Sequence, residues 1–548
     1  MSRYRLLFAL LLALGAAALG FEAWHLGMTV DEPSHVAAAY LYWQGADVLR
    51  PSDAPPLTRM ISGWVPCVMR IPLRRDTPGW QNRDAYQIGA ETVAALDPAR
   101  ARQLLFFMRL PFLAFPLLIV FLLYRWGGAL FGERIGLTLA ACGMLEPTTL
   151  GHGALINSDV AAAFGALWFA YAAWRYWLQP DLRRLLWMTL AMLAAVLIKF
   201  SLLPLVGVAL ALALWRGPRR AGAAIVPLTF YLGTLAAYQF QAAPVPRPLV
   251  YTFRADGVPS WAIPAARVSA RLPWPEQYVR GLLFILHAHR GPGFAAWMLG
   301  HRIGPHAPGY YPLAWAIKFP IPLQALALAG LAALAWRVCR RKPGAAGVFI
   351  WGSAVLYFGP AMLSSIHIGF RHVLPALPFF ILGGGFALAD WAAGRAGRVV
   401  MAVGLAWLAA TSLYTYPQGI SYFNEWIGGP ANGWKCLADS NVDGGQNLPE
   451  LAAFLERRHI PAVKTFLFGL DAPGRYLQPG SWEPLPWPSG AGMVEERRFE
   501  AAPGVYAVSV NALLGVFAPP GYEDYLAGFR ERRPAGRAGY SIFIYEVR

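Results

Sequence analysis

The sequence predicts a mostly α-helical, polytopic membrane protein of about 11 transmembrane helices, with a small soluble α/β domain at its C-terminus. Three observations support this fold class. Of the 548 residues, 57% are hydrophobic and only 14% are charged, which is too apolar for a soluble chain of this length. Apolar runs of nearly bilayer-spanning length recur up to residue 416. The tail from 417 to 548 carries charged residues throughout and short runs typical of strands.

The apolar runs are each close to the roughly twenty residues that a helix needs to cross a bilayer. They lie at about 5–27, 104–124, 134–151, 156–178, 184–199, 201–216, 221–241, 313–336, 346–364, 372–392 and 398–416. Basic residues gather at alternate ends of these runs, beginning with Arg3 and Arg5, whereas the short loops at the other ends hold only Lys199 and Arg371. By the positive-inside rule the N-terminus is cytoplasmic, and an odd number of spans leaves the C-terminus outside. The net charge of +17 therefore follows membrane topology and does not indicate nucleic-acid binding.

Two long segments, 28–103 and 242–312, connect spans on the outer side. In the first, the apolar stretch 57–69 is too short to span and predicts a helix lying at the interface. In the second, residues 274–300 predict an interfacial amphipathic helix that carries His287, His289 and His301. The spacing of these histidines matches no strong zinc motif, so we predict no metal site.

The tail predicts a helix over 448–458 and strands at 464–469, 505–510 and 541–547, which together describe a small α/β domain on the outer face. The chain is expected to divide into a transmembrane catalytic domain, 1–416, and this soluble domain, 417–548. Cys67 and Cys436 fall on the same outer side, so a disulfide between them is open.

Two adjacent carboxylates, Asp31 and Glu32, follow the first span directly. Acidic side chains at membrane depth are costly and tend to be kept for function. Pro33 suits the first turn of a new helix, whose free N–H groups favour ionised carboxylates, as a catalytic base requires. The alternative is that the pair only caps a helix at a solvated edge.

Further ionisable residues lie at the outer ends of the spans, in otherwise apolar surroundings. They are Asp159, Lys199, Lys318, Arg371 and His372. Each one alone is explained by a side chain that reaches from the membrane toward the interface. Together, on one side, they predict a single cavity with carboxylates on one wall and cations on another. Such a cavity suits an anionic group that is held while a neighbouring hydroxyl is deprotonated.

The order of these motifs resembles that of the lipid-carrier-dependent glycosyltransferases of the GT-C superfamily, in particular the bacterial protein O-mannosyltransferase and aminoarabinose transferase group. The matching stretches are Asp31-Glu32, Pro55-Pro-Leu, Asp159, Lys199-Phe-Ser, Lys318-Phe-Pro, Arg371-His-Val-Leu-Pro, Tyr422-Phe-Asn-Glu-Trp-Ile-Gly-Gly-Pro and Asp439-Ser-Asn-Val-Asp-Gly-Gly-Gln-Asn. The resemblance covers about residues 1–460. It departs at Asp443-Gly-Gly-Gln-Asn, where relatives usually have Asp-Trp-Gly-Gln-Asp, and this leaves the role of the segment open.

The resemblance implies an inverting transfer of a sugar from a polyprenyl-phosphate donor to an acceptor hydroxyl in the periplasm, by an enzyme of the inner membrane. Asp31 would be the general base, and Glu32 and Asp159 would orient the acceptor or the base. The donor phosphate would be held by Lys199, Lys318, Arg371 and His372. No cofactor is required, because side-chain cations can receive the phosphate. The acceptor, whether a lipid, a glycan or a protein, stays open.

Two other functions fit part of the pattern. A transporter or flippase for lipid-linked sugars could use the same basic pocket without chemistry, but the sequence has no paired repeats, and its ionisable residues avoid the middle of the spans. An outer-face sensor could use the tail as its working part, although nothing in the tail carries recognisable chemistry.

Overall fold

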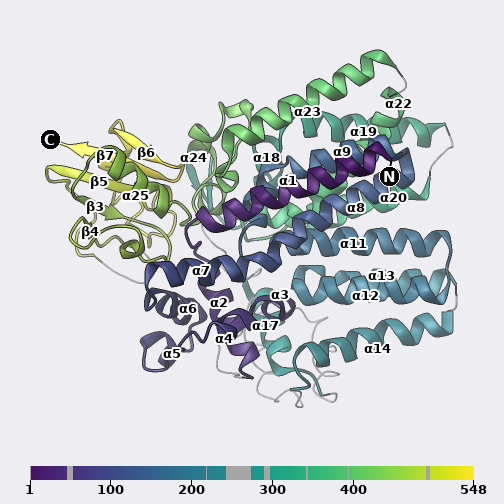
Figure 1. Cartoon of the computed structure of the whole chain (residues 1–548), viewed down its shortest axis with the longest axis horizontal. Helices are drawn as coiled ribbons and strands as arrows, with labels where there is room; N and C mark the ends of the chain where they lie inside the picture. The colour runs from purple at the N-terminus through teal and green to yellow at the C-terminus, as the bar shows by residue number, and fades with distance from the viewer. Residues whose placement is uncertain are drawn as a thin grey trace.

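The computed structural model describes residues 2–45, 54–217, 219–241, 273–288, 296–340, 344–392, 394–488 and 494–548. Its long helices lie side by side, with the N-terminus at one end of the bundle and a sheet-containing domain at the other (Figure 1). Six helical stretches of the described residues are long and apolar enough to cross a membrane. They are α1 (Arg3–His25), α7 to α8 (Pro98–Phe131), α19 (Ile321–Cys339), α20 (Ala345–Met362), η3 to α22 (Phe370–Trp391) and α23 (Arg395–Thr415).

Helices also occupy the other predicted spans, so the polytopic helical fold class is confirmed. These helices are α9 (Glu133–Met144), α11 (Asp159–Leu178), α12 (Leu182–Ile198), α13 (Pro204–Trp215) and α14 (Arg219–Ala237). Helix α11 is the most enclosed of them, and its small residues let α8 and α12 approach closely. The first residue of α11 and the residue after α12 therefore lie at the same end of the bundle.

Three of the predicted spans are interrupted. Two of the breaks fall at a proline, which cannot donate the N–H that a continuous helix needs. Pro147 separates α9 from α10 (Pro147–Gly153), and Pro320 separates α18 (Tyr310–Lys318) from α19. The span over 372–392 divides into η3 (Phe370–Ala376), α21 (Leu377–Gly383) and α22 (Gly385–Trp391). Two of the predicted site residues lie beside such interruptions, Lys318 at the end of α18 and Arg371 in η3.

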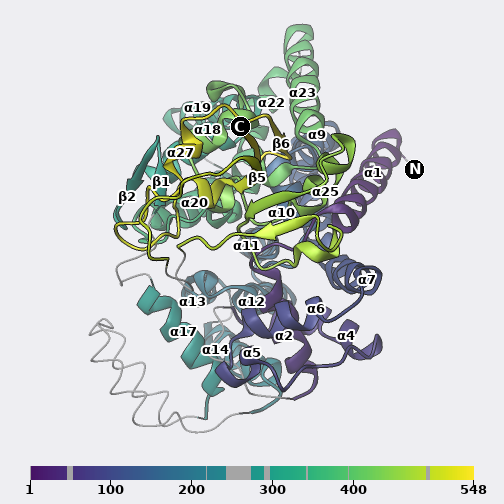
Figure 2. The ribbon, with the colours of Figure 1, turned by 90° about the vertical axis from the view of Figure 1, so that its left-hand side faces the viewer.

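The segment after α1 forms a group of short helices. They are α2 (Glu32–Trp43), α3 (Leu57–Ser62), α4 (Trp64–Val68), α5 (Pro78–Asn82) and α6 (Ala85–Ala94). The single interfacial helix predicted over 57–69 is wrong in detail, because the chain divides at Gly63. A Cβ at Gly63 would lie 2.1 Å from the carbonyl oxygen of Ala39 in α2, so a glycine is required for this close approach. Seen from the end that carries the sheet domain, α2, α4, α5, α6 and α17 gather below that domain (Figure 2).

The second outer segment also differs from its prediction. Residues 276–288 form α17 (Glu276–Ala288), but the chain then continues as an antiparallel hairpin, β1 (Ala296–Met298) and β2 (His301–Ile303), and not as a helix to residue 300. The hairpin is tied to the chain that follows α23, since Leu299 N–H donates to the carbonyl of Cys436 over 2.8 Å. His301 is exposed, whereas His289 and the side chain of His287 lie outside the described residues.

The C-terminal domain contains a mixed five-stranded sheet in the order β4-β3-β5-β7-β6. The strands are β3 (Val463–Phe466), β4 (Trp482–Pro484), β5 (Gly504–Ser509), β6 (Gly536–Ala538) and β7 (Ile542–Val547). Helix α25 (Leu448–Arg457) buries its apolar face against the sheet, and two short helices, α26 (Val510–Leu513) and α27 (Ala527–Arg530), complete the domain. The predicted helix and all three predicted strands are present, at nearly the predicted residues.

A connector of short helical turns joins α23 to this domain and packs against the bundle. It comprises η4 (Gly419–Ser421), η5 (Glu425–Ile427), η6 (Pro430–Asn432), α24 (Gly433–Cys436) and η7 (Asp439–Asn441). Most residues of the connector between 437 and 447 are buried, although many of them are polar. Buried polar groups are costly unless they are hydrogen-bonded, so this segment is expected to bond to its surroundings on several sides.

Candidate active site

Four of the predicted residues meet in one acid–base cluster at the end of the bundle that carries the sheet domain. Arg371 Nη1 forms an ion pair with Asp31 Oδ2 and lies 3.8 Å from Asp159 Oδ2. Lys199 Nζ forms an ion pair with the other oxygen of Asp159. The charges thus alternate along a chain of four side chains that come from separate elements. Asp31 and Lys199, with 25% and 19% of their side chains exposed, are the members most accessible to a ligand.

The position of each side chain follows from where its element ends. Asp31 immediately precedes α2, Asp159 is the first residue of α11, and Lys199 follows the last residue of α12. Arg371 belongs to the 3₁₀ helix η3 at the start of its broken span. If one of these elements were displaced by one turn along the membrane normal, its charge would lie in the apolar layer, where an ionised group is energetically costly. The breaks in the spans therefore place the charges together at one level.

The connector fixes the chain around Arg371. Phe370 N–H donates to Asn441 Oδ1 over 2.9 Å, and the hydroxyl of Ser440 donates to the carbonyl of Ile368. A Cβ at Gly369 would lie 2.1 Å from Ser440 Oγ, so only glycine allows the two segments to approach this closely. Ser440 and Asn441, which lie just before the segment whose role the sequence left open, thus position the arginine of the cluster.

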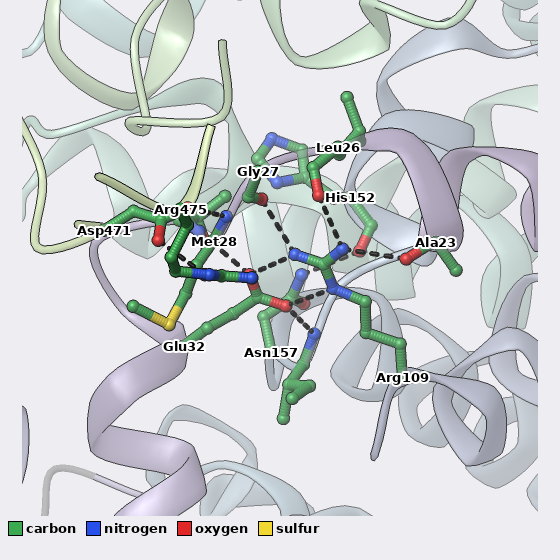
Figure 3. Close-up of polar contacts among 12 residues, drawn as sticks. Ala23, Leu26, Gly27, Met28, Glu32, Arg109, His152, Asn157, Asp471 and Arg475 are labelled. Atoms are coloured by element: carbon green, nitrogen blue, oxygen red, sulfur yellow. Dashed lines mark hydrogen bonds and ion pairs between the residues drawn. The ribbon is translucent and has the colours of Figure 1, made fainter. Parts of the chain in front are cut away.

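Glu32 does not share the exposure of Asp31. Its carboxylate is fully buried and accepts hydrogen bonds from Arg109 Nε at 2.8 Å and Nη2 at 2.6 Å, and from the N–H groups of Thr29 and Ile156 (Figure 3). Burial raises the pKa of Glu32, but Arg109 and the two N–H groups outweigh this effect and hold the pKa below its usual value. With both oxygens occupied, Glu32 does not reach an acceptor. Of its two predicted roles, only orientation of the neighbouring base fits its surroundings.

Arg109 is the principal residue that the prediction of the site missed. Its guanidinium also donates to the carbonyls of Ala23, Leu26 and Gly27 at 2.8–2.9 Å, and so it closes the C-terminal end of α1 (Figure 3). A signal for it was present, because an arginine inside the apolar run 104–124 is unusual in a membrane span. We define residues 26–31, between α1 and α2, as the catalytic loop.

The other side of the catalytic loop is held by residues from beyond the bundle. The N–H groups of Gly27 and Val30 donate to the carbonyls of Gln446 and Gly444, at 2.9 and 2.8 Å. Met28 N–H donates to Asp471 Oδ2 at 2.9 Å, and the buried side chain of Asp471 is itself paired with Arg475 (Figure 3). The loop that carries Asp31 is therefore clamped between Arg109 and the C-terminal part of the chain.

Lys318 is placed differently from its prediction. Its ammonium group is almost completely buried and donates to the carbonyls of Asn441 at 2.6 Å and Ile420 at 3.0 Å. It also lies 4.3 Å from the centre of the Phe423 ring. In this arrangement the cation joins α18 to the connector, whereas the sequence predicted the donor phosphate as its partner.

Two further residues lie around the cluster. His372 follows Arg371 in η3 and interacts electrostatically with Asp159. Asp439 was not predicted as a site residue, but it is buried near Arg371 and Asp31 and has a left-handed backbone with φ of +58°. Burial raises the pKa of Asp439 to about 7, although Arg371 opposes this shift. A strained, non-glycine backbone beside a charge cluster is typical of functional sites.

The cluster combines two carboxylates with two cations. Among the described residues, no group of three or more His, Cys, Asp or Glu side chains is arranged to hold a metal ion. Cys67 and Cys436 are both free thiols, so the disulfide that the sequence left open is not formed. The chain is a polytopic membrane protein with an acid–base cluster at one end of its bundle, beside a domain that contains a five-stranded sheet.

Comparison with known proteins gives similarity at the level of structure. No protein-family model and no curated protein matches the sequence. The crystal structure of ArnT from Cupriavidus metallidurans bound to undecaprenyl phosphate is similar over 98% of this chain and 97% of its own, with 12% identity and a TM-score of 0.47. The apo oligosaccharyltransferase of Archaeoglobus fulgidus is similar over 83% of this chain, with 13% identity and a TM-score of 0.43. The chain spans 58% of the length of that protein.

Proposed function

We propose that the protein is a membrane glycosyltransferase of the GT-C type, which moves a sugar from a polyprenyl-phosphate to an acceptor hydroxyl. The observation that carries this proposal is the convergence of Asp31, Asp159, Lys199 and Arg371 in one partly exposed cluster at an end of the spans. A carboxylate beside cations suits a reaction in which a proton leaves one substrate while negative charge grows on another. The site would face the periplasm, with the N-terminus in the cytoplasm and the sheet domain outside.

In the proposed reaction Asp31 takes the proton of the acceptor hydroxyl. The acceptor oxygen forms a bond to the anomeric carbon on the face opposite the phosphate, and the bond between that carbon and the phosphate oxygen breaks. The bonding electrons leave with the phosphate, where Arg371 and Lys199 stabilise the growing charge. One displacement of this kind inverts the anomeric carbon and needs a single base.

The ion pair between Arg371 and Asp31 implies that the donor binds before Asp31 acts as a base. While Arg371 holds the carboxylate of Asp31, the carboxylate is a poor base, because protonation would break a charge-assisted bond. A donor phosphate that binds Arg371 provides a second anion and releases Asp31 toward the acceptor. Donor binding thus prepares the base, which favours transfer to the acceptor over premature reaction with water.

The test is the variant Asp31→Asn in membranes that contain radiolabelled polyprenyl-phosphate sugars. Sugar transfer is expected to fall by at least about a hundredfold, as for loss of a general base, while undecaprenyl phosphate still binds. The matched control is Asp76→Asn, an exposed carboxylate of the same outer segment whose ion-pair partner among the described residues is Arg74. Undiminished transfer in Asp31→Asn would exclude the proposed base. A transporter, in contrast, would keep moving lipid-linked sugar across the membrane in this variant.

The substrates are found by a second measurement. Glycolipids, envelope glycans and secreted proteins from cells with the wild-type chain are compared by mass spectrometry with those from cells that express Asp31→Asn. A sugar that is present only with the wild type identifies the acceptor class. Identical profiles for the two strains, in cells where the wild-type chain is abundant, would speak against a transferase.

A further inference from the structure

A polar cavity lies at the opposite end of the bundle from the candidate active site. It has a volume of about 410 Å³ and is formed where α11 ends and α12 begins. Its lining residues are Trp168, Tyr171, Ala172, Arg175, Asp181, Arg183, Arg184 and Trp187. Arg175 lies sixteen residues after Asp159 on α11, which is about 24 Å along the helix axis. The hydrocarbon core of a bilayer is about 30 Å thick, so the cavity and the active site lie near opposite membrane surfaces.

The cavity carries excess positive charge. Arg184 is committed to Asp181, whose carboxylate pairs with the guanidinium and also accepts the backbone N–H of Arg184 at 2.8 Å. The guanidinium of Arg175 donates to the hydroxyl of Tyr171 at 3.3 Å, and no carboxylate of the described chain pairs with Arg175 or Arg183. The guanidinium groups of Arg175 and Arg183 are therefore available to bind an external anion.

The aromatic side chains indicate what kind of anion fits. Trp and Tyr gather at the level of lipid headgroups, because their rings are apolar at one end and polar at the other. Here Trp187 is 51% exposed, and Leu186 and Leu190, on the same helix α12, are 49% and 45% exposed. Leucines exposed to this degree on a membrane helix face lipid chains, so the polar cavity continues directly into a surface suited to acyl chains.

We propose that this cavity binds the headgroup of an acidic phospholipid in the leaflet opposite the active site. The phosphodiester lies between Arg175 and Arg183, the glycerol backbone packs against Trp168 and Trp187, and the acyl chains follow Leu186 and Leu190. Basic pockets between membrane helices are a known means of holding acidic headgroups. A zwitterionic lipid is disfavoured, because its own cation would meet the two arginines.

This inference does not depend on the proposed glycosyl transfer. The binding site concerns the end of α11 and α12 that is distant from Asp159 and Lys199, and its test involves no catalysis. Because the two ends belong to the same pair of helices, a lipid bound at one end stabilises the elements that position the two charges at the other.

The test is native mass spectrometry of the purified full chain, titrated with phosphatidylglycerol or with phosphatidylcholine. Phosphatidylglycerol is expected to give one preferred adduct and to raise the unfolding temperature, whereas phosphatidylcholine does neither. The double variant Arg175→Gln/Arg183→Gln is expected to weaken this adduct roughly tenfold to thirtyfold, at about 1 kcal/mol for each arginine.

The matched control is Arg125→Gln/Arg134→Gln, which removes the same charge from exposed arginines at the same end of the bundle. Binding in this variant is expected to equal that of the wild type. Equal losses in the two double variants would overturn the proposal, since they would indicate attraction to a basic surface without a specific site. Inorganic phosphate is the third arm, and stabilisation by phosphate equal to that by phosphatidylglycerol would overturn the assignment to a lipid.

A further variant, Trp187→Leu, tests the same site without a change of charge. It keeps an apolar side chain at a lipid-exposed position but removes the ring that packs against the glycerol backbone. Weaker binding of phosphatidylglycerol, with an unchanged unfolding temperature in the absence of lipid, supports the proposal. Unchanged binding overturns the placement of the headgroup beside this ring.

Discussion

Arg371 contacts both carboxylates of the cluster through a single nitrogen, Nη1. A guanidinium presents several donors in a rigid plane, so it can hold two anions at once and later exchange one of them for a phosphate. A lysine offers the same charge as a compact point on a flexible stem. The identity of the residue, and not only its charge, is therefore expected to matter here.

The first prediction concerns this residue. Arg371→Lys is expected to lower the rate of sugar transfer roughly tenfold or more, because one ammonium cannot keep both Asp31 and Asp159 in place. The rate is measured in membranes with saturating donor. Arg74→Lys, at an exposed ion pair with Asp76, serves as control and should leave the rate unchanged. Full activity of Arg371→Lys would contradict this prediction, since it would mean that the reaction requires only the positive charge of residue 371 and not the geometry of a guanidinium.

The second prediction concerns the buried pair of Glu32 and Arg109, whose side chains are essentially inaccessible. Arg109→Ala should destabilise the protein by about 3–5 kcal/mol, because it leaves a buried carboxylate without its partner. The double variant Glu32→Gln/Arg109→Gln should recover part of this loss, since no charge then remains unpaired. Thermal unfolding of the detergent-solubilised chain compares the two. A double variant less stable than Arg109→Ala would contradict this account.

At the scale of elements, the catalytic loop is held by the C-terminal part of the chain as firmly as by the membrane helices. Three of its N–H groups donate to Gln446, Gly444 and Asp471. Reacting groups must be held to within a fraction of an ångström, and a displacement of 1 Å can cost a hundredfold in rate. The sheet-containing domain and the chain just before it therefore position the loop that carries Asp31.

The third prediction follows from this clamp. Asp471→Ala removes the acceptor of Met28 N–H and the partner of Arg475, and it is expected to lower the turnover number roughly tenfold to a hundredfold with little change in donor affinity. Faster amide hydrogen exchange at residues 27–30, without a change in α11, identifies the cause. The control is Asp524→Ala, which breaks an exposed ion pair with Arg530 in the same domain. Equal activity of the two variants would exclude the clamp.

The sequence predicted best those helices and strands that a hydrophobic period, or the length of an apolar run, is enough to identify. The spans and the strands β3, β5 and β7 depend on apolar patterns that tertiary contacts reinforce. The interruptions were missed, although Pro147 and Pro320 were visible, because the length of an apolar run does not show where its helix starts anew. The hairpin β1–β2 was missed for another reason. The hairpin is also held by a hydrogen bond to the backbone of Cys436, a residue that is remote in sequence.

For the site, the sequence identified the charged residues that form the cluster better than the residues that hold them in place. Asp31, Asp159, Lys199 and Arg371 stood out as charges at the ends of apolar runs, and the structure brings them together. Lys318 gave the same signal, but its partners are backbone carbonyls, which no sequence pattern marks. Asp471 lies in an ordinary polar loop, so its contact with Met28 could not be predicted from composition.

At the scale of the whole molecule, buried carboxyls of the connector make stability depend on pH. Burial raises the pKa of Asp443 to about 7, although N–H groups of Gly445 and Asn511 oppose the shift. Between the usual pKa of an aspartate, about 4, and this raised value, the folded chain binds the proton more tightly than the unfolded chain. The stability that this proton gives is present at acidic pH and is lost as the pH rises through about 7.

The fourth prediction is therefore that the unfolding temperature falls by roughly a few degrees when the pH is raised from 5 to 8. Asp443→Asn should reduce this fall, because the amide mimics the protonated carboxyl and cannot ionise. Differential scanning fluorimetry in buffers of equal ionic strength provides the measurement. Asp76→Asn, at a fully exposed position, should retain the fall seen in the wild type. A stability that rises over this range in the wild type would contradict the prediction.

The contacts of the catalytic loop also bear on how the protein is made. A ribosome delivers Asp31 to the membrane long before it has synthesised Gly444, Gln446 and Asp471, on which the geometry of the loop depends. The nascent chain can thus insert its early helices while Asp31 is not yet held in place. Under the proposed function, a copy that lacks these later residues would be inactive, so it would not consume the lipid-linked sugar beside it.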